Sequence, residues 1–233
     1  KQADEEELTW GGLWAFYVPL AMTPFLLIAA QPIISTAMSR MNQPLDSLAA
    51  WPVVAGLTFT FRSLGVAFNE VVISLIARGE SAKLLARFTR RASIIVSLAF
   101  LLLLITPLHE FLLETAFALP HGLHELCHVG LWICCLLPGL NFYQSWYMGV
   151  LLSKKKTMPI VESVVLFLLV AAGVLSWGVM IDNEIGLYYG AAAYASAMAL
   201  RTLWLQLRSR SVRKAFQAQP EEATQVFNQL AAN

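Results

Sequence analysis

The chain has 233 residues, of which 58% are hydrophobic and only 13% are charged, and its mean hydropathy is +0.62. A soluble domain carries about a quarter charged residues because water must wet its surface. The composition therefore excludes a soluble globular protein and predicts a chain embedded in lipid. The net charge of +1 leaves no basic surplus for binding nucleic acid.

Six apolar runs are long enough to cross a bilayer as helices, which takes roughly 20 residues each. In chain order they are residues 13–38, 48–77, 92–108, 129–152, 158–181 and 185–207. The third run is short, but the preceding segment KLLARFTR extends it through the headgroup region. No strand-like alternation competes with these runs. The predicted fold class is therefore an all-α membrane protein, a bundle of six transmembrane helices.

The basic residues are distributed unevenly between the two ends of this bundle. Of the 16, 14 lie where the runs meet one side of the membrane, and only Arg40 lies in a loop on the other side. Since Lys and Arg are retained in the cytoplasm, both termini are predicted to be cytoplasmic, in a plasma or bacterial inner membrane. The chain then divides into an acidic cytoplasmic linker (1–11), a transmembrane lobe (12–210) and a cytoplasmic tail (211–233).

Several prolines fall inside the predicted spans. Pro19, Pro24 and Pro32 lie in the first span, Pro52 lies near the start of the second, and Pro138 lies in the middle of the fourth. Each removes a backbone donor and bends or loosens its helix. Repeatedly bent helices suit a transporter lobe, but membrane helices in general also carry more proline than soluble ones, so both interpretations stay open.

Several stretches resemble the progressive ankylosis protein family. They are FYVPLAMT, QPIISTAMSR, LAAWPVVAGLTFTFRSLGVAFNEVVISLI and ELCHVGLWICCLLPGLNFYQSWYMGVLLSKKKTMPIVESVV. That family belongs to the superfamily of multidrug and toxin extrusion (MATE-like) transporters and lipid-linked oligosaccharide and polysaccharide flippases. The similarity extends from about Leu8 to Arg213 and consists of scattered identities without one diagnostic motif.

The resemblance implies one six-helix lobe of a two-lobed, alternating-access exporter with a central cavity. The acidic opening resembles an inter-lobe linker and the end resembles a chain terminus, which favours the C-terminal lobe, with the N-terminal lobe as the alternative. Vertebrate members are associated with the export of organic anions. The implied partners are the lipid bilayer, a second six-helix lobe from the same or another polypeptide, and a small-molecule substrate, with an organic anion or a lipid-linked molecule as candidates.

Arg62 is the strongest candidate for a substrate-binding residue. It lies about 21 Å along the second span from Leu48, at about 1.5 Å per residue, and an arginine at a helix centre costs about 2.5–3.5 kcal/mol to insert. One interpretation is that its planar guanidinium faces the central cleft and binds a carboxylate or phosphate. The alternatives are a structural ion pair with Glu70 or Glu162, or a side chain that reaches the inner headgroups.

Other polar side chains in the spans are further candidates for lining a cavity. Asn69 follows Arg62 by seven residues and so lies on nearly the same side of the helix. In the fourth span Asn141, Gln144 and Ser145 form a polar stripe, and Gln31 neighbours a proline in the first span. The alternative for each is a hydrogen bond between neighbouring helices. Glu162 and Arg201 lie near the inner membrane surface and are expected to extend toward the headgroups.

Four histidines lie in or near the long outer loop. His124 and His128 are spaced i, i+4 beside Cys127 and near His121, as metal ligands on a helix are. No carboxylate and helix context completes a zinc motif, so we expect neither a metal nor another cofactor. The sequence also lacks a nucleophile elbow, a glycine-rich phosphate loop and a catalytic carboxylate pair, so the chain is not expected to be an enzyme.

The predicted function is therefore transport, with this chain supplying one lobe. Two alternatives remain: a membrane scaffold or assembly protein that transports nothing, and a half-size transporter that works as a pair of identical lobes. A cleft lined by the first two spans would favour transport, whereas a dry apolar core would favour the scaffold.

Overall fold

The computed structural model describes residues 10–79, 82–181 and 183–231, with side chains for residues 21, 23–79, 83–181 and 183–213. All elements in this part of the chain are helical. They are α1 (Trp10–Met38), α2 (Pro44–Ala77), α3 (Ala82–Ile105), α4 (Leu108–Thr115), the 3-10 turn η1 (His121–Leu123), α5 (His124–Ile133), α6 (Leu137–Ser153), α7 (Met158–Ile181) and α8 (Gly186–Ala231). The predicted all-α class is confirmed.

Four helical segments are long and apolar enough to cross a membrane. They are Pro44–Ala77, Lys83–Ile105, His121–Ser153 and Met158–Ile181. Thr23–Met38 in α1 is apolar but shorter, and α8 does not reach the required hydropathy over the residues described. In α8 the tyrosines and Arg201 lower the hydropathy, although Arg201 itself is buried inside the bundle. The structure thus supports four of the six predicted spans by length and composition.

The surface of the bundle exposes large apolar side chains, as expected of a protein surrounded by lipid. Large apolar side chains are exposed along α3, including Ile95, Leu98 and Leu102 at 64%, 57% and 63% of their area, and Trp177 on α7 is 63% exposed. In water such a surface would be an aggregation liability. In lipid it needs no covering partner, so the chain is a membrane-embedded protein.

The predicted fourth span is broken in the structure. α5 ends at Ile133 and α6 begins at Leu137, so residues 134–136 interrupt the helix directly before Pro138. Pro138 lies at the start of α6, where its missing backbone N–H costs least. Pro52, by contrast, lies inside α2 without ending it.

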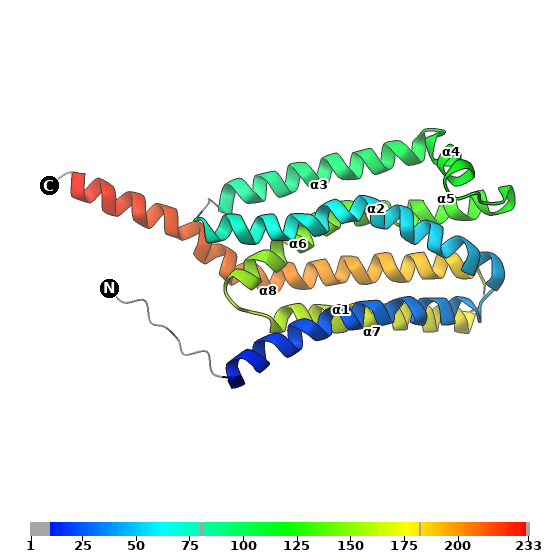
Figure 1. Cartoon of the computed structure of the whole chain (residues 1–233), viewed down its shortest axis with the longest axis horizontal. Helices are drawn as coiled ribbons and strands as arrows, with labels where there is room; N and C mark the ends of the chain where they lie inside the picture. Colours follow the sequence, from blue (N-terminus) through cyan, green and yellow to red (C-terminus); the bar gives the residue numbers. More distant parts are fainter. Residues whose placement is uncertain (1–9, 80–81, 182, 232–233) are drawn as a thin grey trace.

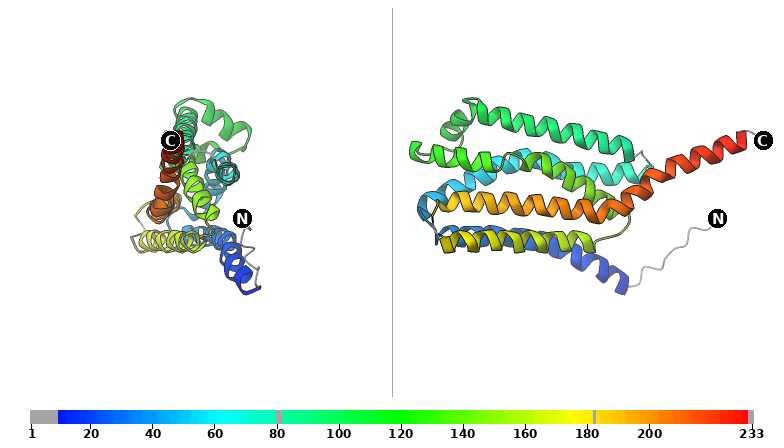
Figure 2. Two further views of the ribbon diagram at one scale, coloured as in Figure 1. Left: turned by 90° about the vertical axis from the view of Figure 1, so that its left-hand side faces the viewer. Right: turned by 180° about the vertical axis from the view of Figure 1, so that it is seen from behind.

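α6 occupies the centre of the bundle and is buried on nearly all sides. Glycines let its neighbours approach closely: a Cβ added at Gly139 would lie 2.2 Å from Ser97 Oγ of α3, and one at Gly65 of α2 would lie 3.2 Å from the Asn141 backbone. Small residues at such contacts are how membrane helices bring their backbones together. α7 packs against both α1 and α8, on the other side of the bundle from α3 (Figure 1, Figure 2).

The start of α1, the α2–α3 turn, the α6–α7 turn and the final part of α8 lie at the same end of the bundle (Figure 1). This is the arrangement that an even number of crossings produces, and it brings the basic segments to one end. The predicted linker lies largely outside the described residues. α8 continues without a break from the last predicted span through Ala231, so the tail begins as an extension of that helix.

Candidate functional site

Arg62 projects from α2 into the interior, where it is only 9% exposed. Its guanidinium donates to the Tyr194 hydroxyl of α8 and, over 3.4 Å, to Asn141 Oδ1 of α6. The guanidinium carbon also lies 5.4 Å from the centre of the Tyr194 ring, a cation–π distance. Both hydrogen-bond partners are neutral, so these contacts bring no negative charge to Arg62.

The two carboxylates considered as ion-pair partners of Arg62 are placed elsewhere. Glu162 accepts from Arg208 over 2.6 and 2.9 Å and from Trp204 Nε1 over 3.2 Å, while Glu70 is exposed on α2. Among the residues that the structure describes, no carboxylate forms a salt bridge with Arg62. The ion-pair alternatives for Arg62 are therefore wrong, and a reach to the inner headgroups does not fit its burial.

A cavity of about 280 Å³ opens beside Arg62. Its polar lining comes from α1, α2, α8 and the α5–α6 break: Gln31, Trp51, Thr58, Arg62, Cys134 and Tyr194, with Ala55, Gly56 and Phe59 completing the wall. Figure 1 shows that α1 and α2, which meet at the turn near Asn42, diverge along this part of the bundle. The cavity thus lies in the angle between the first two spans, α1 and α2.

Two further polar groups in this cavity matter to its chemistry. The Trp51 indole donates to Gln31 Oε1 over 3.0 Å, which orients the amide at the open side. The Thr58 hydroxyl is buried beside the Cys134 thiol, and within the part of the chain described it makes no hydrogen bond of good geometry. A cation, a hydroxyl and an amide around one cavity form a site that a carboxylate or phosphate fits.

The polar stripe of α6 is used in bonds between helices. Asn141 Nδ2 donates to the Arg62 carbonyl over 3.1 Å, Gln144 donates to Thr202 Oγ1 over 2.9 Å, and Ser145 donates to the Gly65 carbonyl over 2.6 Å. None of the three lines the cavity. Asn141 nevertheless reaches the site indirectly, because it holds both the backbone and the guanidinium of Arg62. In this structure the stripe therefore forms hydrogen bonds between helices, the alternative interpretation, and a role in lining a cavity shared with a second lobe stays a prediction.

Asn69 does not line the cavity either. It is half-buried, and its Oδ1 is buried without a hydrogen-bond partner among the described residues. Such an acceptor costs about 1–3 kcal/mol when it is left unsatisfied, so Asn69 stays a candidate for a polar contact that forms only when something else is bound.

Arg201 contradicts the expectation that it would reach the headgroups. It is only 3% exposed and donates to Ser163 Oγ over 3.4 Å, with Met148 Sδ 3.8 Å from its terminal nitrogen. The helix places it facing α6 and α7 rather than the lipid, and a long side chain cannot then turn outward. Arg62 and Arg201 together give the interior two cations.

The site residues that sequence reasoning missed are Trp51, Thr58, Cys134 and Tyr194. Tyr194 had the clearest signal, since it interrupts the small-residue run GAAAYASA with a side chain that carries a hydroxyl. Thr58 and Cys134 are ordinary residues in membrane helices, and nothing in the sequence distinguishes them.

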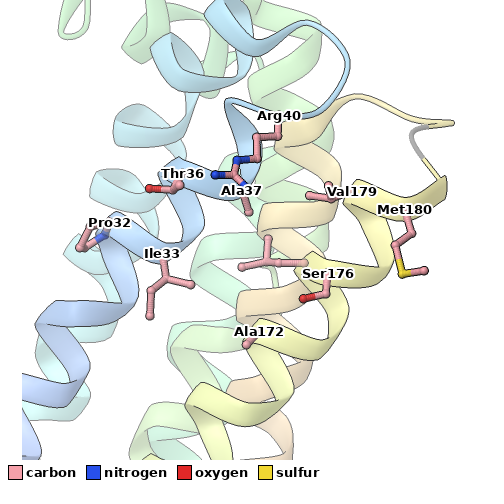
Figure 3. Close-up of a pocket in the computed structure, with 10 residues that line it drawn as sticks. Pro32, Ile33, Thr36, Ala37, Arg40, Ala172, Ser176, Val179 and Met180 are labelled. Atoms are coloured by element: carbon pink, nitrogen blue, oxygen red, sulfur yellow. The ribbon is translucent and has the colours of Figure 1, made fainter.

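A second hollow of about 570 Å³ lies between α1 and α7 (Figure 3). Its walls are mostly apolar, and Arg40 lies at the end near the α1–α2 turn. Among the described residues that line it, Thr36, Arg40 and Ser176 are polar and all three are exposed, so this hollow has no buried polar group comparable to Arg62.

No family model matches the chain, and no curated protein and no solved structure matches it significantly. The resemblance to the progressive ankylosis family therefore stays a prediction, and the functional argument depends on the geometry around Arg62.

Proposed function

We propose that this chain is one six-helix lobe of a membrane transporter, in which Arg62 binds an anionic substrate, or the anionic group of a lipid-linked one, between α1 and α2. The six spans are α1, α2, α3, the α5–α6 pair, α7 and residues 186–207 of α8. That part of α8 measures about 33 Å at about 1.5 Å per residue, which is enough to cross a hydrocarbon core of about 30 Å.

One observation carries the proposal: a buried arginine, with no carboxylate partner among the described residues, forms part of the wall of a cavity. A buried charge is costly unless it is paired and hydrogen-bonded. The contacts to Tyr194 and Asn141 occupy only part of the guanidinium's donors, and an anion in the cavity would satisfy the others and offset the charge. Ionisable groups within membrane spans mark substrate pathways for this reason.

The position of the cavity favours transport over a scaffold. It opens where the first two spans diverge, and Phe59 of its wall is 58% exposed; α1 also exposes Phe25 and Ile28, at 68% and 69%. A second six-helix lobe packed on this apolar rim would enclose the site. A scaffold has no use for a buried cation, and apolar residues of similar volume would serve it at least as well.

The test is anion flux into liposomes that contain the full-length protein, with a tricarboxylate, a nucleoside triphosphate and pyrophosphate as trial substrates. Arg62→Gln removes the charge and keeps a polar side chain. Losing one partner of a desolvated charge pair costs about 2–5 kcal/mol, so flux at limiting substrate should fall at least about thirtyfold. Arg62→Lys keeps the charge but loses the planar fork, and an intermediate loss is expected.

Arg87→Gln is the matched control, because Arg87 is an exposed arginine of α3 outside the cavity. Its flux should equal that of the wild type. Size-exclusion profiles and unfolding temperatures of all variants establish that they fold. A folded Arg62→Gln protein with wild-type anion flux would defeat the proposal, and a wild type that carries no solute would favour the scaffold. Flux that requires two copies of the chain would identify the second lobe as a homodimer partner.

A further inference from the structure

All four histidines of the chain lie at the end of the bundle where α3 leads into α4 and α5. The structure divides them into two pairs. His109 and His128 stack with their ring centres 4.4 Å apart, and their nitrogens are engaged: His109 Nδ1 is 2.7 Å from the Thr106 carbonyl and His128 Nε2 is 2.9 Å from Trp132 Nε1. This pair has a packing role.

The other pair is joined by a carboxylate. Glu114 lies in the last turn of α4, His121 begins η1, and His124 begins α5. One ligand atom from each of the three lies within 4.8 Å of the other two, and His121 Nδ1 is 3.5 Å from Glu114 Oε1. The i, i+4 spacing of His124 and His128 pointed to a different pair, because the sequence does not show that α4 folds back to bring Glu114 beside His121.

Backbone hydrogen bonds hold the segment that connects Glu114 to His121 and His124. Leu119 N donates to the Leu113 carbonyl over 3.0 Å, and Leu123 N donates to the Pro120 carbonyl over 2.9 Å. The Leu119 carbonyl is also 3.0 Å from His124 Nε2. If Nε2–H donates to that carbonyl, the lone pair on Nδ1 of His124 is available to bind an ion. Metal-binding histidines commonly have a hydrogen-bond partner that orients the ring in this way.

We propose that Glu114, His121 and His124 bind a zinc ion, with the fourth position open to water. Two imidazoles and one carboxylate are a zinc donor set. Ligand atoms on a tetrahedral zinc ion are about 3.3 Å apart, given bonds of about 2.0–2.1 Å. The 3.5 Å contact between Glu114 and His121 is close to that separation. The side chain of His121 is 86% exposed, so it can rotate to shorten the remaining distances among the three ligand atoms, which are up to 4.8 Å.

The local charge also favours a cation. Between Arg91 and Lys154 the sequence has no Lys or Arg, whereas Glu110, Glu114 and Glu125 lie in this stretch. Bound zinc would link the last turn of α4 to the first turn of α5, and so hold together the α4–η1–α5 segment that connects α3 to α6. The site is independent of Arg62, so its failure leaves the proposed transport untouched.

The experiment measures zinc binding by the full chain, purified in micelles without a histidine tag, by calorimetry and by the shift in unfolding temperature. Zinc should bind at one site per chain and raise the unfolding temperature, whereas Mg²⁺ and Ca²⁺ at the same concentration should not, because they prefer oxygen ligands. His121→Ala and Glu114→Gln should each weaken zinc binding at least about tenfold. Glu110→Gln, a carboxylate of α4 outside the cluster, should bind as the wild type does.

Three results would overturn the site. The first is no zinc-dependent shift in the wild type. The second is wild-type zinc affinity in both His121→Ala and Glu114→Gln. The third is an equal response to Mg²⁺ or Ca²⁺, which would show that the cluster attracts any cation by charge alone.

Discussion

The contact between α2 and α6 predicts a sharp difference among three glycine-to-alanine substitutions. A Cβ at Gly149 would lie 2.4 Å from Val72 Cγ1 and 2.9 Å from Val72 Cβ. Turning Val72 about χ1 moves Cγ1 but leaves Cβ in place, and valine in a helix has one strongly preferred rotamer. The helices must therefore separate. Overpacking of this kind costs about 1–3 kcal/mol, against a gain of up to about 1 kcal/mol from alanine's helix propensity.

Two glycines elsewhere in the bundle are matched controls. A Cβ at Gly173 of α7 meets nothing within 4 Å, so Gly173→Ala should stabilise by up to about 1 kcal/mol. A Cβ at Gly190 of α8 would clash with the tip of Met38, 1.8 Å away, but Met38 has flexible torsions that can withdraw it. Gly190→Ala should therefore lie between the other two.

The assay is thermal unfolding in micelles, followed by a dye that reacts with thiols as Cys127 and Cys134 become exposed, since both are buried in the fold. At about 2–4 °C per kcal/mol for a chain of this size, Gly149→Ala should unfold several degrees below Gly173→Ala. If Gly149→Ala is as stable as Gly173→Ala, α2 and α6 do not approach as closely as the structure shows, and the packing argument fails.

Two further predictions concern orientation and the second buried arginine. Cysteines introduced as Gln43→Cys, Gly122→Cys and Asn183→Cys should react with an impermeant thiol reagent added outside intact cells, whereas Lys155→Cys should not, and labelling of Lys155→Cys from outside would reverse the orientation. Arg201→Met should keep or raise the unfolding temperature, because Arg201 is buried with only weak neutral partners; a drop of several degrees would show that its charge stabilises the fold.

The helical architecture could be predicted from the sequence because lipid forces backbone groups to bond within each span. The lengths of α2 and α7 follow from long, mostly apolar runs. The start of α3 at Ala82 agrees with the expected extension through KLLARFTR, but α3 ends at Ile105, before the predicted Leu108. The α5–α6 break was signalled by Pro138, but which residues leave the helix depends on packing against α2 and α3, and composition does not encode that.

The candidate site was only partly predictable. Arg62 was identified because a cation in a span is expensive, and that reasoning is independent of tertiary structure. Which side chains surround it depends on helix rotation and crossing, so Tyr194 and Thr58 were missed. Arg201 was misread for the same reason: a position near a helix end suggests a route to the headgroups, yet the rotation of α8 turns it inward.

The central claim is tested most directly by flux through the wild-type protein. Liposomes containing the full-length protein would be supplied with organic anions, cationic drugs or a fluorescent lipid-linked substrate, under sodium and proton gradients. The cavity around Arg62 predicts saturable movement of an anionic substrate. Movement of cationic drugs alone, or no movement of any substrate in vesicles where the protein is folded and correctly inserted, would contradict it.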